Sequence, residues 1–181
     1  LPAERRVNAD NRTIGIITTY ISDYIFPSIV RGVEATLKER GYRLLLSSTD
    51  NRKDRERESL ESMLGHGVCG LIVEPTKSAE GNPNFDNYLA LEDHGIPLVM
   101  INERYQDLDC PSVRMDDEAG GFLAADHLLR LGHTRIAGFF KTDDLQGVRR
   151  MKGFMRAFRE HGVAAGHRRH GAVALGRKPR R

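Results

Sequence analysis

The sequence has few cysteines and no long apolar run. Its 181 residues include two cysteines, Cys69 and Cys110, which lie far apart and form no CxxC pair. We therefore expect two reduced thiols, with neither a disulfide framework nor a metal site. No stretch approaches the ~20 consecutive apolar residues that span a bilayer, and the polar start of the chain lacks the pattern of a secretory signal. These absences predict no membrane segment and a cytoplasmic location.

One stretch of the chain lacks acidic residues. The whole sequence has 28 Lys+Arg against 25 Asp+Glu, a net charge of +3. Residues 164–181 hold six of the basic residues and no acid, so the remainder carries a net charge of −3. A basic segment invites a nucleic-acid interpretation, but this one has no interleaved aromatic side chains and no helix-turn-helix pattern. We expect no DNA-reading surface in this chain.

The motifs of nucleotide-binding and catalytic proteins are also missing. The glycines at 65, 67 and 70 match the dinucleotide fingerprint GxGxxG, but that fingerprint has to follow a strand and open a helix. Here they close a predicted helix and lead into a strand, so we interpret Gly65 and Gly67 as a C-cap and a turn. The sequence has no P-loop motif, no GxSxG and no supported grouping of nucleophile and base. It predicts no cofactor and no enzymatic activity.

The apolar residues predict alternating strands and helices. Strands of this spacing, separated by helices of this length, form parallel β-α-β units, so the predicted fold class is α/β with a doubly wound parallel sheet. After Gly162 the periodicity stops, and residues 164–181 are expected to be disordered. The predicted strands are Thr13–Thr19, Tyr42–Thr49, Val68–Glu74, Leu98–Asn102, Ser112–Met115 and Arg135–Lys141, and the predicted helices are Pro27–Arg40, Asp54–Gly65, Asn84–His94, Asp117–Leu131 and Leu145–His161.

Polar side chains follow the predicted strands at the edge of the sheet where ligands of open parallel sheets bind. They mix carboxylates, amides, cations and aromatic rings, which suits a small polyhydroxylated ligand because each hydroxyl both donates and accepts. Loops of any α/β protein are polar as well, so position alone leaves the sugar interpretation open. The candidate ligand-binding residues are Tyr20, Asp23, Tyr24, Glu74, Lys77, Asn102, Glu103, Asp116, Asp144, Gln146 and Arg150.

Two pairs of adjacent aspartates also have a structural interpretation. Asp116 and Asp117 precede a predicted helix, where a carboxylate caps free N–H groups and favours the helix dipole. We expect one of them to cap and the other to be available to a ligand. In front of the last helix we expect Thr142 or Asp143 to cap, which leaves Asp144 as the more available carboxylate.

The order and spacing of several short segments over about 150 residues carry a family resemblance. The chain resembles the effector-binding domain of LacI-type bacterial repressors, which implies the type I periplasmic-binding-protein fold. Each segment is weak on its own. The segments are Thr13–Ile17, Arg31–Glu34, Gly70–Glu74, Gly95–Asn102, His127–His133 and Arg150–Phe154.

Three longer segments, Ile17–Glu34, Gly70–Ala79 and Lys141–Phe154, are similar to a branch of this family that has a winged-helix DNA-binding head of the GntR type. The resemblance implies a homodimeric repressor that binds operator DNA through that head and is released by a sugar effector, L-arabinose. It also places Arg150 at the effector-binding arginine of the family, and Gln146 one turn before it.

The same resemblance implies that parts of the family's usual chain are missing. No DNA-binding head precedes Leu1, and the second subdomain is expected to continue well past Phe158. We expect a linker remnant at 1–12, a nearly complete first subdomain at 13–115, the start of a second at 116–163, and a basic tail foreign to the family at 164–181. Such a truncated chain is expected to bind arabinose weakly or not at all. A free-standing sugar-binding protein of the periplasmic type is the alternative.

Overall fold

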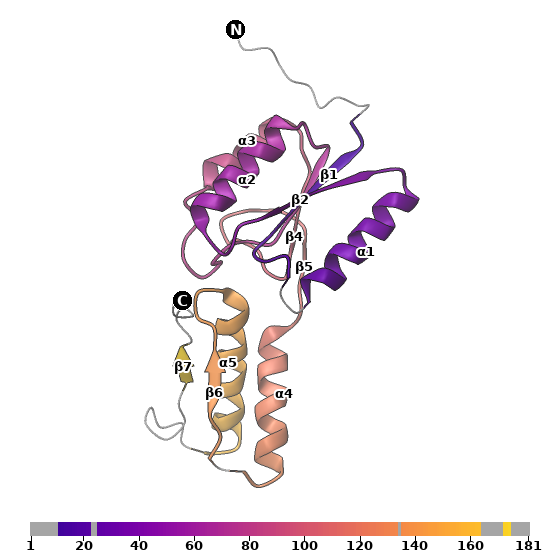
Figure 1. Ribbon diagram of the computed structural model, residues 1–181. Helices are drawn as coiled ribbons and strands as arrows, with labels where there is room; N and C mark the ends of the chain where they lie inside the picture. Colours follow the sequence, from indigo (N-terminus) through magenta and orange to yellow (C-terminus); the bar gives the residue numbers. More distant parts are fainter. Residues whose placement is uncertain (1–10, 23–24, 134, 164–171, 175–181) are drawn as a thin grey trace, which may run out of the picture. The chain divides into compact units, whose positions relative to one another are not determined.

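The computed structural model describes residues 11–22, 25–133, 135–163 and 172–174. The chain forms two compact units, shown in Figure 1. The chain passes into the second unit between Val113 and Arg114, whereas the sequence analysis placed this boundary after Met115. The short stretch Ser78–Glu80, which was expected in the first unit, groups with the second.

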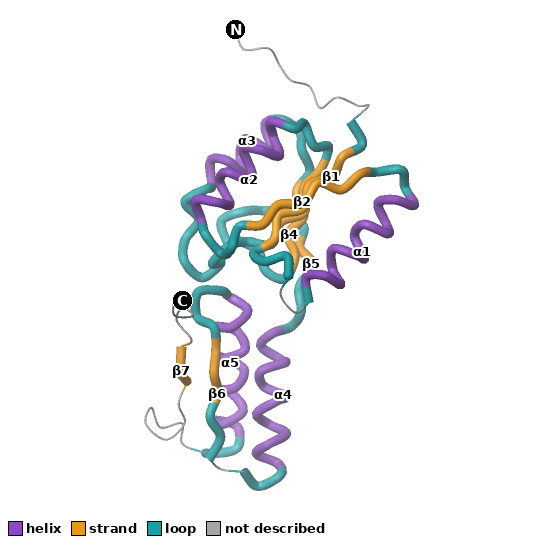
Figure 2. The backbone as a smooth tube through the Cα atoms, viewed as in Figure 1, coloured by secondary structure: helices purple, strands orange, loops and turns teal. Residues whose placement is uncertain are grey.

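A five-stranded parallel sheet with the order β2-β1-β3-β4-β5 forms the centre of the first unit. Helix α1 covers one face of this sheet, and α2 and α3 cover the other (Figures 1 and 2). The predicted α/β class with a parallel sheet is therefore confirmed. The elements are β1 (Thr13–Thr18), α1 (Phe26–Glu39), β2 (Arg43–Ser48), α2 (Lys53–Gly65), β3 (Gly70–Val73), α3 (Phe85–Asp93), β4 (Leu98–Ile101) and β5 (Ser112–Val113).

The core of the first unit lies between the sheet and the pair α2 and α3. Ile17, Val73 and Met100 of the sheet are fully buried there, together with Leu60 of α2. Each such side chain contributes about 1.5–3 kcal/mol of hydrophobic stabilisation. The neighbouring Ile16 is fully buried as well, although it points to the opposite face of the sheet. Burial on both faces explains why β1 is a continuous β-branched run in the sequence rather than an alternating one.

The second unit is built on two helices, α4 (Asp117–Arg130) and α5 (Leu145–Glu160), which run side by side in the same direction (Figure 1). Glycines allow their backbones to approach closely. A Cβ added to Gly153 would lie 1.9 Å from the carbonyl oxygen of Glu118, and one added to Gly121 would lie 2.1 Å from that of Arg150. Phe154 and Phe158 of α5 are buried against Ala125 and Leu129 of α4.

A short strand in the last part of the chain corrects one expectation. Residues 164–181 were predicted to lack regular structure, but Ala172–Ala174 form β7, which pairs in parallel with β6 (Gly138–Phe140). A run of three residues is too short to show a period-2 pattern, and the strand is defined by its partner rather than by its own sequence. The other residues of this segment lie outside the described parts of the chain.

Candidate functional site

The strand order of the first unit reverses beside β1, because β2 pairs with one of its edges and β3 with the other. Ligands of open α/β sheets bind at the carboxyl ends of the strands beside such a reversal. The residues that follow β1 and β3 meet there. The carboxylate of Glu74 accepts hydrogen bonds from the backbone N–H of Thr19 at 2.7 Å and from its hydroxyl at 2.6 Å.

The side chain of Glu74 also reaches the loop after β4. Its second oxygen accepts a hydrogen bond from the amide Nδ2 of Asn102 at 3.1 Å, and the Glu74 residue is 8% exposed. Two of the predicted site residues, Glu74 and Asn102, are thus brought into direct contact. The carboxylate connects the ends of β1, β3 and β4, so it fixes the relative positions of the polar groups at this edge of the sheet.

Strained backbone marks the same edge. Among the described residues, four that are not glycine have positive φ angles: Asp50, Asn51, Lys77 and Asn102, at 47°, 56°, 43° and 65°. All of them lie in the loops that follow β2, β3 and β4. Such conformations cost of order 1–3 kcal/mol each and persist where the surrounding contacts hold them, as at binding sites. The backbone N–H of Lys77 is held by the side-chain oxygen of Asn51 at 3.3 Å.

Three further candidates of the first unit follow β1, and one follows β4. Tyr20 is half-buried, and its carbonyl accepts a hydrogen bond from the Thr18 hydroxyl at 3.3 Å. Glu103 is 3% exposed, and its carboxylate accepts the backbone N–H of Arg104 at 2.9 Å. Asp23 and Tyr24 lie outside the described residues.

In the second unit, the aspartates before α4 divide their roles. Asp116 is the N-cap of α4 and accepts the N–H of Ala119 at 2.9 Å. Its neighbour Asp117 is buried and accepts a hydrogen bond from Nε of Arg150 at 2.7 Å. The prediction that one of the pair caps is confirmed, but the other is an anchor for the candidate arginine. The side chain of Arg150 is 45% exposed, so the guanidinium remains accessible to solvent.

The prediction for the cap of α5 is wrong. Asp144, rather than Thr142 or Asp143, is the N-cap, and its carboxylate accepts the N–H of Gly147 at 2.7 Å. The helix begins at Leu145, so Asp144 stands at the N-cap position, from which a carboxylate reaches the N–H of the third helical residue. Asp144 also forms an ion pair with Lys141 at 2.7 Å. It is therefore less available to a ligand than expected, while Gln146 lies half-buried on the first turn.

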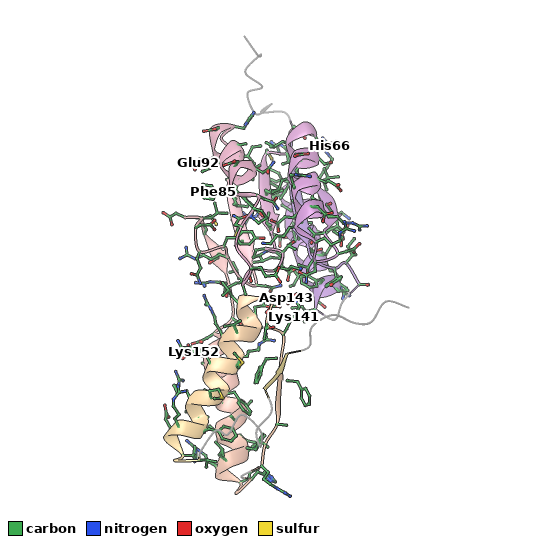
Figure 3. The ribbon with its side chains drawn as sticks, turned by 90° about the vertical axis from the view of Figure 1, so that its left-hand side faces the viewer. His66, Phe85, Glu92, Lys141, Asp143 and Lys152 are labelled. Carbon is green, nitrogen blue, oxygen red and sulfur yellow. The ribbon has the colours of Figure 1, made fainter. Side chains whose placement is uncertain are left out.

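Lys141 and Asp143 lie side by side, as Figure 3 shows, with Nζ and Oδ1 3.1 Å apart. Burial alone lowers the pKa of Lys141, but the hydrogen bond from its ammonium group to Asp144 and the charges of Asp144 and Asp143 outweigh burial and raise it. The lysine is therefore fully charged at neutral pH. Ser78 caps the same helix, because its hydroxyl accepts the N–H of Leu145 at 2.9 Å.

Two residues of these sites, Thr19 and Asn51, are absent from the candidate ligand-binding residues, and the role of a third, Asp117, was left open between capping and ligand binding. Thr19 is the last residue of the first predicted strand and Asn51 lies two residues past the second, so a rule that retained every polar residue at that edge would have included them. Asp117 was recognised as one of two adjacent aspartates, but its hydrogen bond with Arg150 was not predicted. That contact between α4 and α5 joins residues far apart in the sequence. No group of three or more His, Cys, Asp or Glu side chains that could hold a metal occurs among the described residues.

Residues 11–178 match the family described as periplasmic binding proteins and sugar binding domain of LacI family. The chain belongs to this family. The match continues to residue 178, so it includes most of the segment that the sequence analysis treated as foreign to the family. The resemblance to LacI-type effector-binding domains is confirmed.

Two curated relatives are arabinose metabolism transcriptional repressors. The one from Geobacillus stearothermophilus is 66% identical over 154 residues, which cover 85% of this chain and 42% of that protein. The one from Halalkalibacterium halodurans is 52% identical over 156 residues, which cover 86% of this chain and 42% of that protein. The chain therefore spans about two fifths of the length of these relatives.

Solved structures of the family have the same fold. A putative ribose operon repressor from Burkholderia thailandensis superposes with a TM-score of 0.78 at 29% identity, over 90% of this chain and 60% of that one. A LacI-type regulator from Alkaliphilus metalliredigens, solved with D-xylulofuranose, gives 0.71 at 27% identity, over 84% of this chain and 54% of that one. Within the described residues, no helix has the length and apolar character that crossing a membrane requires.

Proposed function

We propose that this chain is the sugar-sensing part of a cytoplasmic transcriptional repressor whose effector is L-arabinose. The observation that carries the proposal is the cluster of polar groups around Glu74, beside the reversal of strand order, in a chain 66% identical to an arabinose metabolism repressor. A pentose presents hydroxyl groups around its ring, and each needs both an acceptor and a donor. Tyr20, Glu74, Lys77, Asn102 and Glu103 supply both kinds.

The proposed sugar contacts of the second unit are Asp116, Asp144, Gln146 and Arg150. Arg150 is the strongest of these, because Asp117 holds its guanidinium through Nε, and the planar guanidinium can form a forked hydrogen bond to vicinal oxygens through its terminal nitrogens. Asp116 and Asp144 each use one carboxylate oxygen for a helix cap. Their part in sugar binding is therefore secondary in this proposal.

The proposed output is a shift of conformational population rather than a reaction. The sugar binds one arrangement of the repressor dimer more tightly than the other, and this difference in affinity lowers the population that holds operator DNA. DNA binding belongs to a head outside these 181 residues, of the GntR type. A free-standing transport protein is the second candidate, but the names of the relatives are those of regulators.

A thermal-shift screen tests the choice of effector. The protein for this test is residues 1–163 of this chain joined to the C-terminal remainder of the Geobacillus stearothermophilus relative. L-Arabinose is expected to raise its melting temperature, and D-glucose and D-ribose to raise it less. A shift with another sugar but none with L-arabinose would overturn the proposed effector. For the 181-residue chain alone we expect binding weaker than micromolar by calorimetry.

A further inference from the structure

A fully buried carboxylate lies beneath the loop that follows β3. Glu56 belongs to the charged helix α2, yet it is 0% exposed. It accepts hydrogen bonds from the backbone N–H of Thr76 at 2.7 Å and from Nδ2 of Asn84 at 3.0 Å. The hydroxyl of Tyr105 lies 3.0 and 2.8 Å from its two oxygens. Burial of a carboxylate is unfavourable by several kcal/mol unless such donors surround it.

Tyr105 completes the arrangement from the loop after β4. Its hydroxyl is also 2.7 Å from the carbonyl oxygen of Thr76, so the backbone donor and the backbone acceptor of Thr76 both contact this pair of side chains. Lys53 donates to the same hydroxyl at 2.9 Å, and its ammonium lies 4.3 Å from the ring centroid. Burial, followed by the nearby carboxylate of Glu56, raises the pKa of Tyr105, so the hydroxyl keeps its proton.

The segment held in this way carries the strained residue Lys77. The Thr76 hydroxyl is 2.9 Å from that of Thr49, and the N–H of Lys77 is held by Asn51 at 3.3 Å. Two consecutive residues of one loop, Thr76 and Lys77, are therefore held by contacts from three other segments. These are α2 with Glu56, the loop after β4 with Tyr105, and the loop after β2 with Thr49 and Asn51. Without these contacts, the positive φ of Lys77 would relax to an ordinary conformation.

We propose that Glu56 and Tyr105 are positioning residues for the sugar. They hold Thr76, and through it Glu74 and Lys77, in the conformation that binds the ligand, so that little ordering remains to be done on binding. Neither side chain contacts the sugar itself. This inference rests on the proposed function, because it assumes that the loop after β3 belongs to the sugar site.

Amide hydrogen exchange of the 181-residue chain tests the positioning directly, without any ligand. Tyr105→Phe removes the hydroxyl and keeps the ring, which packs edge-on against Tyr88. The control is Ser59→Ala, because Ser59 is also buried on α2 and its hydroxyl pairs with Ser47, 2.8 Å away and not in this loop. Exchange of the Thr76 and Lys77 amides is expected to accelerate at least tenfold in Tyr105→Phe and to stay unchanged in Ser59→Ala.

The positioning role would be contradicted if the Thr76 and Lys77 amides exchanged at the same rate in Tyr105→Phe as in the unsubstituted chain. It would also be contradicted if Ser59→Ala accelerated their exchange to the same extent. If Tyr105→Phe does not fold, Glu56→Gln replaces it. Glutamine has the same shape as glutamate, but it presents an NH₂ group, which donates, where Glu56 presents a carboxylate oxygen that accepts.

A titration with L-arabinose, followed by amide chemical shifts, tests the consequence for binding in the completed protein of the thermal-shift screen, with and without each substitution. The dissociation constant is expected to rise about tenfold in Tyr105→Phe and to stay unchanged in Ser59→Ala, even where both variants lose similar thermal stability. Faster exchange with unchanged affinity would overturn the positioning role. If the unsubstituted completed protein shows no response to the sugar, the proposed function fails, while the exchange result still decides whether Glu56 and Tyr105 hold the loop.

Discussion

The buried carboxylate of Asp117 on α4 accepts a hydrogen bond from Nε of Arg150 on α5 at 2.7 Å. The carboxylate side chain is 3% exposed and the arginine side chain is 45% exposed. An exposed ion pair of this length would contribute little, but here one partner lies inside the protein. Asp117 therefore orients the arginine that the family resemblance assigns to effector binding.

Replacing Arg150 is expected to abolish the thermal shift caused by L-arabinose. Arg150→Ala removes the forked donor and leaves Asp117 buried without its partner, so the free energy of unfolding is expected to fall by about 1–2 kcal/mol. Arg150→Lys keeps the charge but loses the planar fork. Relative to Arg150→Ala, it is expected to recover most of the free energy of unfolding but little of the arabinose-induced thermal shift. A full arabinose shift in Arg150→Ala would remove Arg150 from the site.

A methyl group at Gly153 is expected to separate the two helices of the second unit. Because its Cβ would lie 1.9 Å from a backbone oxygen of α4, Gly153→Ala is expected to cost about 3 kcal/mol and to lower the melting temperature of this unit by roughly 12–24 °C.

The matched control is Gly120→Ala on α4, where a Cβ meets nothing within 4 Å. This substitution is expected to leave stability unchanged or to raise it by up to about 1 kcal/mol, since alanine is the better helix former. Thermal unfolding followed by the amide signals of α4 and α5 measures both. Equal melting temperatures for the two variants would contradict the close approach of the helices.

The ion pairs of Glu118 predict acid sensitivity of the second unit. Lys152, labelled in Figure 3, lies 2.8 Å from this carboxylate, and Arg156 lies 2.9 Å from it. The hydrogen bond from Lys152 lowers the pKa of Glu118 below its ordinary 4.5, and the charges of Lys152 and Arg156 add to this against the effect of desolvation.

The unfolded chain therefore binds the proton of Glu118 more readily than the folded chain does. This contribution to stability is present above pH 4.5 and is lost as the pH falls through the lowered folded value. Urea unfolding between pH 7 and pH 3 is expected to show a steeper loss in the unsubstituted chain than in Glu118→Gln. Parallel curves for the two proteins would show that these ion pairs do not stabilise the fold.

Glu74→Gln is expected to disturb the polar edge of the sheet. The glutamate accepts three hydrogen bonds from Thr19 and Asn102, and glutamine presents an NH₂ group in place of one acceptor. The expected cost is about 1–3 kcal/mol, with loss of the arabinose-induced shift. Glu61→Gln is the control, because Glu61 is exposed on α2 and its contact with Arg57 is 3.9 Å long. Retained sugar binding in Glu74→Gln would exclude its carboxylate from the site.

Much of the fold was predictable because its signals are local. The β-branched run of β1 and the apolar spacing of α4 each lie within one short window of sequence, and both elements end within one residue of their predicted bounds. Strand β7 was missed because three residues carry no periodicity, and its pairing with β6 is the only feature that defines it.

The candidate site was predictable in type but not in detail. Position after a strand identified Glu74 and Asn102, and the structure joins them by a hydrogen bond. The burial of Glu56 could not be predicted from a helix dense in charged residues, because its donors come from Asn84, which precedes α3, and from the loops after β3 and β4. Whether a carboxylate is buried and holds another element in place depends on contacts between elements distant in sequence, which local secondary-structure propensity does not report.

The most direct test of the proposed function is an L-arabinose titration of the ¹⁵N-labelled protein used in the thermal-shift screen, in which residues 1–163 of this chain are completed by the C-terminal remainder of the Geobacillus stearothermophilus relative. L-Arabinose is expected to shift the amide signals of Thr19, Lys77 and Asn102 beside the strand-order reversal and that of Arg150 in the second unit. D-Glucose is expected to shift these amides less. Absence of any sugar response at these positions, or shifts confined to the far ends of the strands, would contradict the account.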